Sequence, residues 1–161
     1  MCSSALANFF IEKSKKENIE ISNLKLQKLM FIGYGWVLAL IDKDLTDGEG
    51  FQAWQHGPVL PSVYHEMKRF GNNNIAEYAT DYDCEENKTY IPSIQDSRTI
   101  SVLTKVWNVY KGFTAWSLRN MTHKKDSPWD RTEKSGFTDI DIGYIKDYYI
   151  SYIDNLLADE C

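Results

Sequence analysis

The feature that most constrains the fold is a long apolar stretch between residues 22 and 41, SNLKLQKLMFIGYGWVLALI. Ser22 fits the cap of a helix, because a serine side chain can accept a hydrogen bond from one of the first free backbone N–H groups. Apolar residues then recur at helical spacing and aromatic residues widen the stripe. We therefore predict one helix at the centre of the core. Gly33 and Gly35 each cost about 1 kcal/mol relative to Ala in a helix, which predicts that another backbone packs closely there.

Shorter helices are predicted around this central one. Start and stop residues mark each of them, because Ser, Thr and Asp favour the cap, Pro favours the first turn and Gly favours the end. The predicted helices begin at Ser3–Ser4, at Pro61 with a stop at Gly71, at Ser97 with a stop at Gly112, at Thr114, and at Asp141 with a stripe that runs to Leu156.

The β content is predicted to be small. FQAW at residues 51–54 alternates and is aromatic, which predicts a short strand, and TYIP at 89–92 is the expected partner strand. Residues 72–88 are predicted to form an exposed acidic segment, and residues 122–139 a long polar loop. The sequence therefore predicts a helix-dominated α+β domain of about six helices with a small β element in its middle, spanning residues 1–161.

Length and charge narrow the class of protein. A chain of 161 residues is one domain's worth and can bury a proper core. Lys and Arg number 18 against 23 Asp and Glu, a net charge of −5. That balance lacks the basic surface of a general nucleic-acid binder, and it suits a basic partner.

The cysteines and the apolar runs predict a cytoplasmic protein. Cys2, Cys84 and Cys161 are odd in number and form no Cys-x-x-Cys pair, which favours free thiols in a reducing compartment. The N-terminus lacks a basic region ahead of its apolar residues, unlike a signal peptide. The richest apolar run, 29–41, is about 13 residues long, whereas a bilayer span needs about 20. We predict no membrane segment.

Motifs of known chemistry are missing from the sequence. There is no phosphate-binding glycine loop and no G-x-S-x-G nucleophile elbow. HEMKR at 65–69 begins like a zinc-protease helix, but Arg69 stands where the second histidine should be. We therefore expect no catalytic residue, no metal and no cofactor. A small hydrolase or metal-dependent enzyme using His56, His123 and a carboxylate stays open as an alternative.

Two loops combine aromatic, imidazole and proline residues and are the predicted functional surface. They are WQHGPVLP at 54–61 and LRNMTHKKDSPW at 118–129. Functional side chains concentrate on loops held by rigid elements, and tryptophan is common at interface hot spots. Trp54 either plugs the core or contacts a partner, and Trp129 either anchors a partner or folds back over the domain. The candidate partner-binding residues are Trp54, His56, Pro58, Val59, Tyr64, Thr122, His123 and Trp129.

These segments together resemble one known family. The matching residues are Leu26 to Leu29 (L-Q-K-L), Ala53 to Val59, Leu118, Thr122–His123 and Pro128–Trp129. Their order resembles the Panacea domain of SocA-like antitoxins, which is also found in phage-associated proteins. By this resemblance Leu26, Lys28, Leu29, Gly57 and Pro128 are structural motif residues.

The resemblance implies a function and a set of partners. It implies a compact, mostly helical antitoxin without enzymatic activity that neutralises a cognate toxin by direct protein binding. One branch of the family resembles a proteolytic adaptor that delivers its toxin to a ClpXP-type protease. A DNA-binding autoregulator, with a helix–turn–helix around Gly112 and phosphate contacts from residues 122–125 and Arg119, is a further alternative that the acidic balance disfavours. Association into a homo-oligomer stays open.

Overall fold

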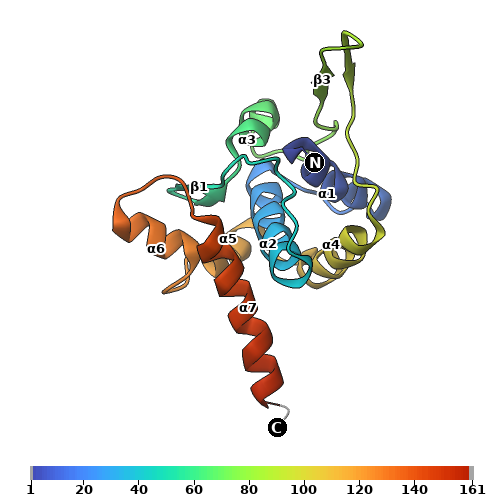
Figure 1. Ribbon diagram of the computed structural model, residues 1–161. Coiled ribbons are helices and arrows are strands. Elements are labelled where there is room, and N and C mark those ends of the chain that lie inside the picture. Colours follow the sequence, from blue (N-terminus) through green and yellow to red (C-terminus); the bar gives the residue numbers. More distant parts are fainter. Residues whose placement is uncertain (1, 160–161) are drawn as a thin grey trace.

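A computed structural model describes the backbone of residues 2–159 and the side chains of residues 2–155. The described chain is dominated by helices, with two small antiparallel hairpins (Figure 1). In chain order the elements are α1 Ser3–Glu17, α2 Asn23–Ile41, β1 Gln52–Trp54, β2 Gly57–Val59, α3 Pro61–Met67 with a 3₁₀ turn Lys68–Phe70, β3 Asp81–Asp83, β4 Lys88–Tyr90, α4 Ser97–Tyr110, α5 Ala115–Thr122, α6 Pro128–Ser135 and α7 Ile142–Asp159. The predicted helix-dominated α+β class is confirmed.

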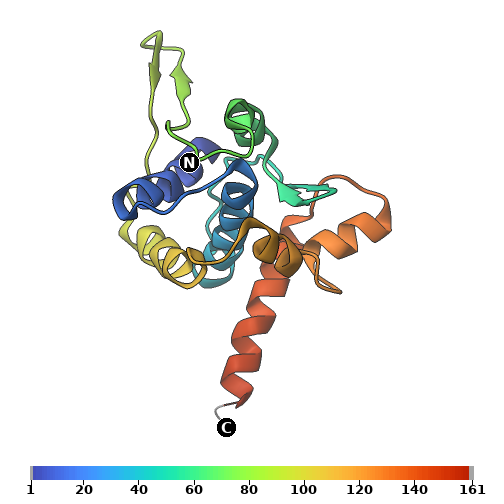
Figure 2. The ribbon, with the colours of Figure 1, turned by 180° about the vertical axis from the view of Figure 1, so that it is seen from behind.

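Helix α2 is the centre of the fold, as predicted. Ser22 caps it and accepts a hydrogen bond from the backbone N–H of Lys25. Helices α1, α3, α4, α5 and α7 and strand β2 all pack against α2, which runs through the middle of the molecule (Figures 1 and 2). Because it has neighbours on nearly every side, α2 is buried almost all round rather than along one stripe.

The same burial explains the length of the apolar segment. Within the described residues, α2 is long and apolar enough to cross a membrane by length and composition. However, 72% of its most apolar window is buried inside the fold. The apolar residues therefore serve as the core of this domain.

Side chains, and not a neighbouring backbone, occupy the space beside the two glycines of α2. A Cβ atom at Gly33 would lie 2.7 Å from Leu103 Cδ2, and one at Gly35 would lie 2.1 Å from Cε2 of Tyr149. The prediction of close packing is confirmed, but its expected partner was wrong. Gly35 lets the buried Tyr149 ring of α7 lie flat against α2.

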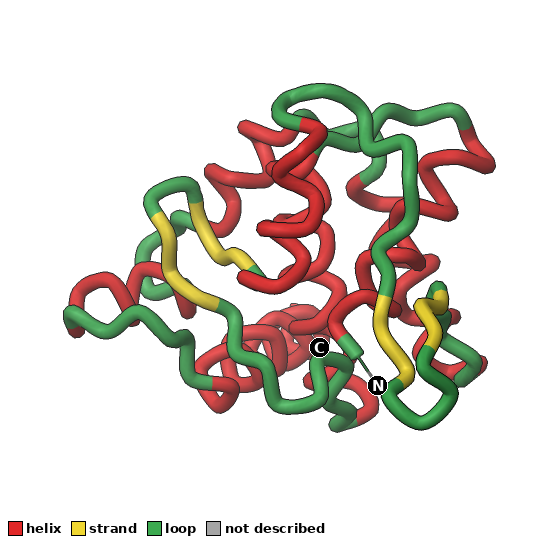
Figure 3. The backbone as a smooth tube through the Cα atoms, turned by 90° about the horizontal axis from the view of Figure 1, so that it is seen from above, coloured by secondary structure: helices red, strands yellow, loops and turns green. Residues whose placement is uncertain are grey.

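The predicted pairing of FQAW with TYIP is wrong. Strand β1 pairs with β2, with Gln52 opposite Val59 and Trp54 opposite Gly57. Only two residues join these strands, and closing so short a loop costs less chain entropy than a distant pairing. TYIP contributes β4, which pairs with β3 within the segment that was predicted to be an exposed loop. That second hairpin extends away from the helices (Figures 1 and 2), and the two hairpins lie on opposite sides of the molecule (Figure 3).

The prediction of an unbroken polar loop from 122 to 139 is also wrong, because α6 lies within it. Ser127 caps α6, Pro128 occupies its first turn and Gly136 ends it in the left-handed conformation. These are ordinary helix signals, but only Pro128, Trp129 and Thr132 of α6 are buried. Helical periodicity is recognised over a window of about 11–18 residues, and α6 has only eight residues. The described chain therefore has one helix more than the six predicted.

The other helices lie where they were predicted, with small differences at their caps. Cys2 and not a serine precedes α1, and Asp96 instead of Ser97 caps α4 by accepting the backbone N–H of Thr99. Thr114 caps α5 as expected. Cys161 and the side chain of Leu156 lie outside the described residues.

The packing of α7 on α2 predicts a steric cost at Gly35. Gly35→Ala should lower the free energy of unfolding by about 1–3 kcal/mol, because the new methyl group overlaps the rigid ring of Tyr149. Gly112→Ala is the control, since a Cβ there meets nothing within 4 Å. Urea unfolding of both variants tests this. Equal stability of the two variants would contradict the packing of α7 described here.

Candidate functional site

The β1–β2 hairpin is fixed to α2 by two adjacent polar side chains of the L-Q-K-L motif. Gln27 Oε1 accepts a hydrogen bond from the backbone N–H of Leu60 at 2.9 Å. Lys28 Nζ donates to the backbone carbonyl of Pro58 at 2.7 Å. Both side chains are buried, and the flanking Leu26 and Leu29 are fully buried in the core. The motif therefore combines two core residues with two residues that hold the hairpin.

Gly57 is required where the hairpin meets these side chains. Its φ of +99° is one that side-chain-bearing residues rarely adopt. A Cβ atom there would also lie 2.8 Å from Thr122 Oγ1 and 2.9 Å from Lys28 Cε. The hairpin can approach α2 and α5 this closely only because position 57 carries no side chain.

The other side of the hairpin is held by α6 and the end of α5. Trp129 Nε1 donates to the backbone carbonyl of Trp54 at 2.8 Å, and His123 Nε2 lies 3.2 Å from the carbonyl of Gln55. The His123 and Trp129 rings stack with centroids 3.7 Å apart. Ser127, which caps α6, donates to the carbonyl of Thr122 and joins α6 to α5. We call Gln27, Lys28, Thr122, His123 and Trp129 the hairpin clamp.

Three basic side chains, Lys28, His123 and Arg119, lie close to one another in and beside the clamp. Burial, with the Arg119 charge nearby, lowers the pKa of Lys28 to about 7. Burial also lowers the pKa of His123, and the charges of Arg119 and Lys28 act in the same direction. Arg119 Nε is buried without a hydrogen-bond partner. Within residues 2–155, no carboxylate forms a hydrogen bond or ion pair with these three side chains.

An open groove of about 570 Å³ lies beside the clamped hairpin. Trp54, Tyr64 and Trp116 provide aromatic walls from β1, α3 and α5. Trp54 packs edge-on against Tyr64 with centroids 4.9 Å apart, and His56 lies edge-on to the exposed Trp116 at 5.5 Å. The full lining is Asn23, Leu24, Gln27, Trp54, Gln55, His56, Val59, Tyr64, Lys68, Gly71, Asn72 and Trp116.

The eight candidate partner-binding residues divide into two groups. Trp54, His56, Val59 and Tyr64 line the groove, and of these His56 is the most exposed. The other four are held in or near the clamp and are largely inaccessible: Pro58, Thr122, His123 and Trp129.

Burial shows where the two tryptophan rings lie in the free chain. The Trp129 ring folds back over the domain and is 9% exposed. Trp54 is half-buried, and its indole N–H donates to Gln52 Oε1 at 2.9 Å. It is therefore a wall of the groove rather than a plug of the core.

Several residues of this region were not singled out as site residues from the sequence, among them Trp116, Lys68 and Gln27. Trp116 and Lys68 line the groove, and Gln27 belongs to the clamp. Trp116 carries the one available signal, an aromatic residue at a polar position of an amphipathic helix. Nothing in the sequence alone indicates that the Gln27 side chain accepts a hydrogen bond from Leu60, which lies 33 positions away.

The histidines do not form a metal-binding cluster. His123 is stacked on Trp129, and both of its ring nitrogens face backbone carbonyls. His56 lies against Trp116 and His65 against Trp54. Among the described residues, no group of three His, Cys, Asp or Glu side chains is arranged to hold a metal ion.

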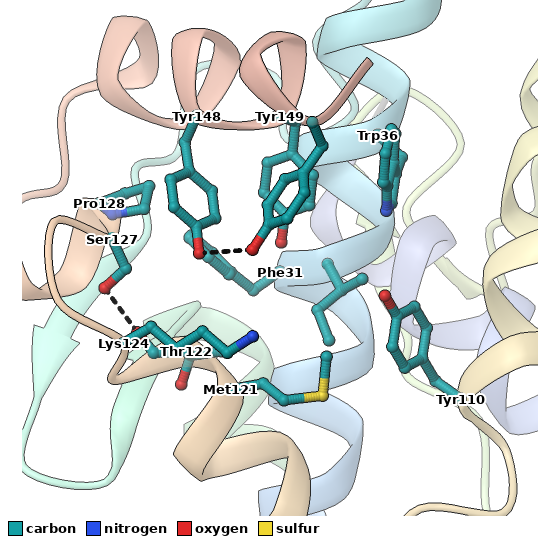
Figure 4. A pocket seen from close by; sticks show the side chains of 12 residues that line it. Phe31, Trp36, Tyr110, Met121, Thr122, Lys124, Ser127, Pro128, Tyr148 and Tyr149 are labelled. Carbon is teal, nitrogen blue, oxygen red and sulfur yellow. Dashed lines mark hydrogen bonds between the residues drawn. The ribbon is translucent and has the colours of Figure 1, made fainter. Parts of the chain in front are cut away.

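A second, smaller pocket of about 150 Å³ lies where α7 meets α2 and α5 (Figure 4). Tyr148 and Tyr149 enter it from α7, and the hydroxyl of Tyr148 is hydrogen-bonded to that of Tyr152 at 3.0 Å. Thr122 and Ser127 line its other side, next to the clamp. The pocket therefore lies between α7 and the residues next to the clamp.

Comparison with known proteins identifies the family. The family model described as "Antitoxin SocA-like, Panacea domain" matches residues 26–130. Antitoxin SocA of Caulobacter vibrioides (strain NA1000 / CB15N) is 30% identical over 140 residues, which cover 86% of this chain and 74% of that protein. The chain belongs to the SocA-like Panacea family. No solved structure matches it.

The Panacea match and the clamp occupy the same part of the chain. The match begins at Leu26, the first motif residue, and ends one residue after Trp129. Every side chain of the clamp and every wall of the groove except Asn23 and Leu24 lies inside it. The residues that carry the family resemblance are thus those that hold the β1–β2 hairpin in place.

The buried amine of Lys28 predicts a pH-dependent stability. An unfolded chain releases this proton near the ordinary lysine value of about 10.4, whereas the folded chain releases it at about 7. Between these values the unfolded state binds more protons, so the free energy of unfolding of the wild type should rise with pH. Lys28→Met should lack this contribution. It should also be less stable at high pH by about 1–3 kcal/mol, because the Pro58 carbonyl loses its donor.

Urea unfolding of both proteins at about pH 6.5, 8 and 9.5 checks this. The two chains share their other titrating groups, and Lys28 acts on the pKa of His123 in the same direction as burial does. Lys105→Met on the exposed face of α4 is the control and should follow the wild type. Parallel stability curves for the wild type and Lys28→Met would contradict a buried, largely neutral amine at position 28.

Proposed function

We propose that this chain is an antitoxin that neutralises a cognate toxin by binding it directly as a single cytoplasmic domain, with no bond made or broken by its own side chains. The observation that carries this proposal is the groove. Its walls are aromatic, and His56 and Trp116 are exposed at its rim. The hairpin that carries His56 is held by the clamp, which lies inside the family-matched segment. Membership in an antitoxin family supplies the class of partner.

The construction of the groove suits binding. A rigid surface loses little conformational entropy on association, so more of the contact energy appears as affinity. Large aromatic side chains at the centre of an interface supply most of the binding energy. Here Trp54, Tyr64 and Trp116 come from three different elements and meet around one hollow.

The proposal is tested by co-expression with the products of the neighbouring genes. One of these products, expressed alone, should arrest growth, and co-expression of this chain should restore growth. Copurification at equal stoichiometry should accompany the rescue. If no neighbouring product is toxic, or if a toxic one remains lethal beside this chain, the antitoxin role fails.

Delivery of the toxin to a ClpXP-type protease is the second part of the proposal. It rests on the family resemblance, and the same strains test it. The half-life of the toxin should shorten when this chain is present and lengthen again when the protease is deleted. An unchanged half-life together with full rescue would leave simple sequestration as the mechanism.

Side-chain truncation at the groove should separate binding from folding. Trp116→Ala should weaken toxin binding by about 30-fold or more, as at other interface hot spots. The melting temperature should stay close to that of the wild type, because Trp116 is 56% exposed. Val109→Ala removes an equally exposed apolar side chain from α4, outside the groove, and should bind normally. Normal binding by Trp116→Ala would exclude the groove as the toxin-binding surface.

A further inference from the structure

The net charge of the chain does not describe the groove. Residues 77–88 carry five carboxylates and one lysine, which account for four of the five net negative charges. This segment contains the β3–β4 hairpin, on the opposite side of the molecule from β1–β2 (Figure 3). The remainder of the chain is close to neutral, so the charge at the groove depends on the residues around it.

The groove itself lacks negative charge. None of its lining residues, all within the described part of the chain, is Asp or Glu. Its ionisable side chains are Lys68, His56 and Tyr64. The walls also carry the exposed amide groups of Gln55 and Asn72, which can both donate to and accept from a peptide backbone.

A further cation, Arg119 of α5, lies beside this lining. The guanidinium of Arg119 sits 5.8 Å from the ring of Trp116, which in turn contacts His56 at the rim. Its Nε is buried and unpartnered, and Lys28 lies close enough for mutual repulsion. Nε itself is out of reach of a ligand, but the guanidinium of Arg119 is half-exposed and its Nη1 donates to the side chain of Asn120 at the surface. A carboxylate at this half-exposed guanidinium offsets the repulsion from Lys28.

We propose that the groove binds an extended peptide segment of the partner that carries Asp or Glu next to an apolar side chain. Arg119 and His56 receive the carboxylate, and the apolar side chain lies between Trp54, Tyr64 and Trp116. This inference rests on the proposed function, in which the segment belongs to the toxin. The net charge of the chain alone predicted a basic partner. The proposed groove is instead a cationic surface, and it binds an acidic segment of the partner.

A peptide fits the groove better than a nucleic acid. Polynucleotides gain most of their affinity from many phosphate contacts. Here Lys68 and Arg119 are the two formal cations at the groove and its margin, on a chain of net charge −5.

The first test selects binders from a displayed library of random nine-residue peptides on the full-length chain. We expect the enriched sequences to share an acidic residue beside an apolar one. Replacing that Glu by Gln in a synthetic peptide should weaken binding about 10- to 100-fold, measured by fluorescence anisotropy. Enrichment of basic or uncharged sequences, or of none, would overturn the proposal.

The second test asks whether Arg119 is the partner of that carboxylate. Arg119→Gln should bind the Glu and Gln peptides almost equally, so the discrimination seen with the wild type disappears. Trp116→Ala should weaken both peptides, and it keeps the proposal testable if Arg119→Gln does not fold. Lys105→Gln, on α4 outside the groove, should discriminate as the wild type does. If folded Arg119→Gln still bound the Glu peptide more tightly than the Gln peptide by the wild-type factor, Arg119 would not be the partner of the carboxylate. If Trp116→Ala bound both peptides as tightly as the wild type, the groove would not be the peptide site.

Competition identifies the class of ligand. A single-stranded oligonucleotide that displaces the peptide at lower concentration than the free peptide does, and fails to bind Trp116→Ala, would assign the groove to nucleic acid and overturn the proposal. These assays contain no toxin. A chain that passes them but gives no rescue in cells would refute the antitoxin role and leave the acidic-peptide site standing.

Discussion

The hydrogen bond from the buried Lys28 amine to the carbonyl of Pro58 connects the core of this protein to its surface. Lys28 belongs to α2, around which the other helices pack, and Pro58 belongs to the hairpin whose tip carries His56. A fully buried lysine is rare because removing its charge from water is costly. Burial lowers the pKa of Lys28 to about 7, which reduces the share of the charged form, and the amine donates to a carbonyl in either protonation state.

The clamp explains why the family motifs are scattered along the chain. A two-stranded hairpin is marginal by itself and needs packing on both sides. Gln27 and Lys28 hold the β2 strand from α2, and His123 and Trp129 hold the carbonyls near the tip from α5 and α6. The groups that they bind are the carbonyls of Trp54, Gln55 and Pro58 and the N–H of Leu60. Those of Pro58 and Leu60 are buried and would otherwise lack a partner. Residues about 100 positions apart therefore depend on one another through a short stretch of backbone.

Local signals in the sequence were enough to predict much of the fold. The central helix, its Ser22 cap and the helices beginning near Pro61, Ser97, Thr114 and Asp141 follow from periodicity and capping, which act within a few residues. The predictions of the strand pairing and of the loop that contains α6 failed, and local signals were not enough for either. The β1–β2 pairing required comparing a two-residue turn with a distant strand. Helix α6, with eight residues, is shorter than the window of about 11–18 residues over which a helical period is recognised.

Part of the candidate site was predicted from the sequence, but the places of its residues in the structure were not. Trp54, His56 and Tyr64 line the groove, whereas Thr122 and Trp129 are buried against the hairpin. Aromatic and histidine side chains in polar loops look alike in a sequence whether they face solvent or fold back. What separates them is a long-range hydrogen bond, such as that from Trp129 to the carbonyl of Trp54, and no local pattern reports it.

The net charge of the chain likewise does not show where its charged residues lie. The carboxylates that make the chain acidic are concentrated in residues 77–88, while the basic side chains Lys28 and Arg119, which pair with no carboxylate among the described residues, lie beside the β1–β2 hairpin. Charges this far apart are largely screened from each other in salt, since the screening length is about 8–10 Å. The two faces therefore present opposite electrostatics to a partner. In the proposed binding mode, Arg119, His56 and Lys68 decide recognition at the groove, and the net charge of the chain governs its solubility and its long-range steering.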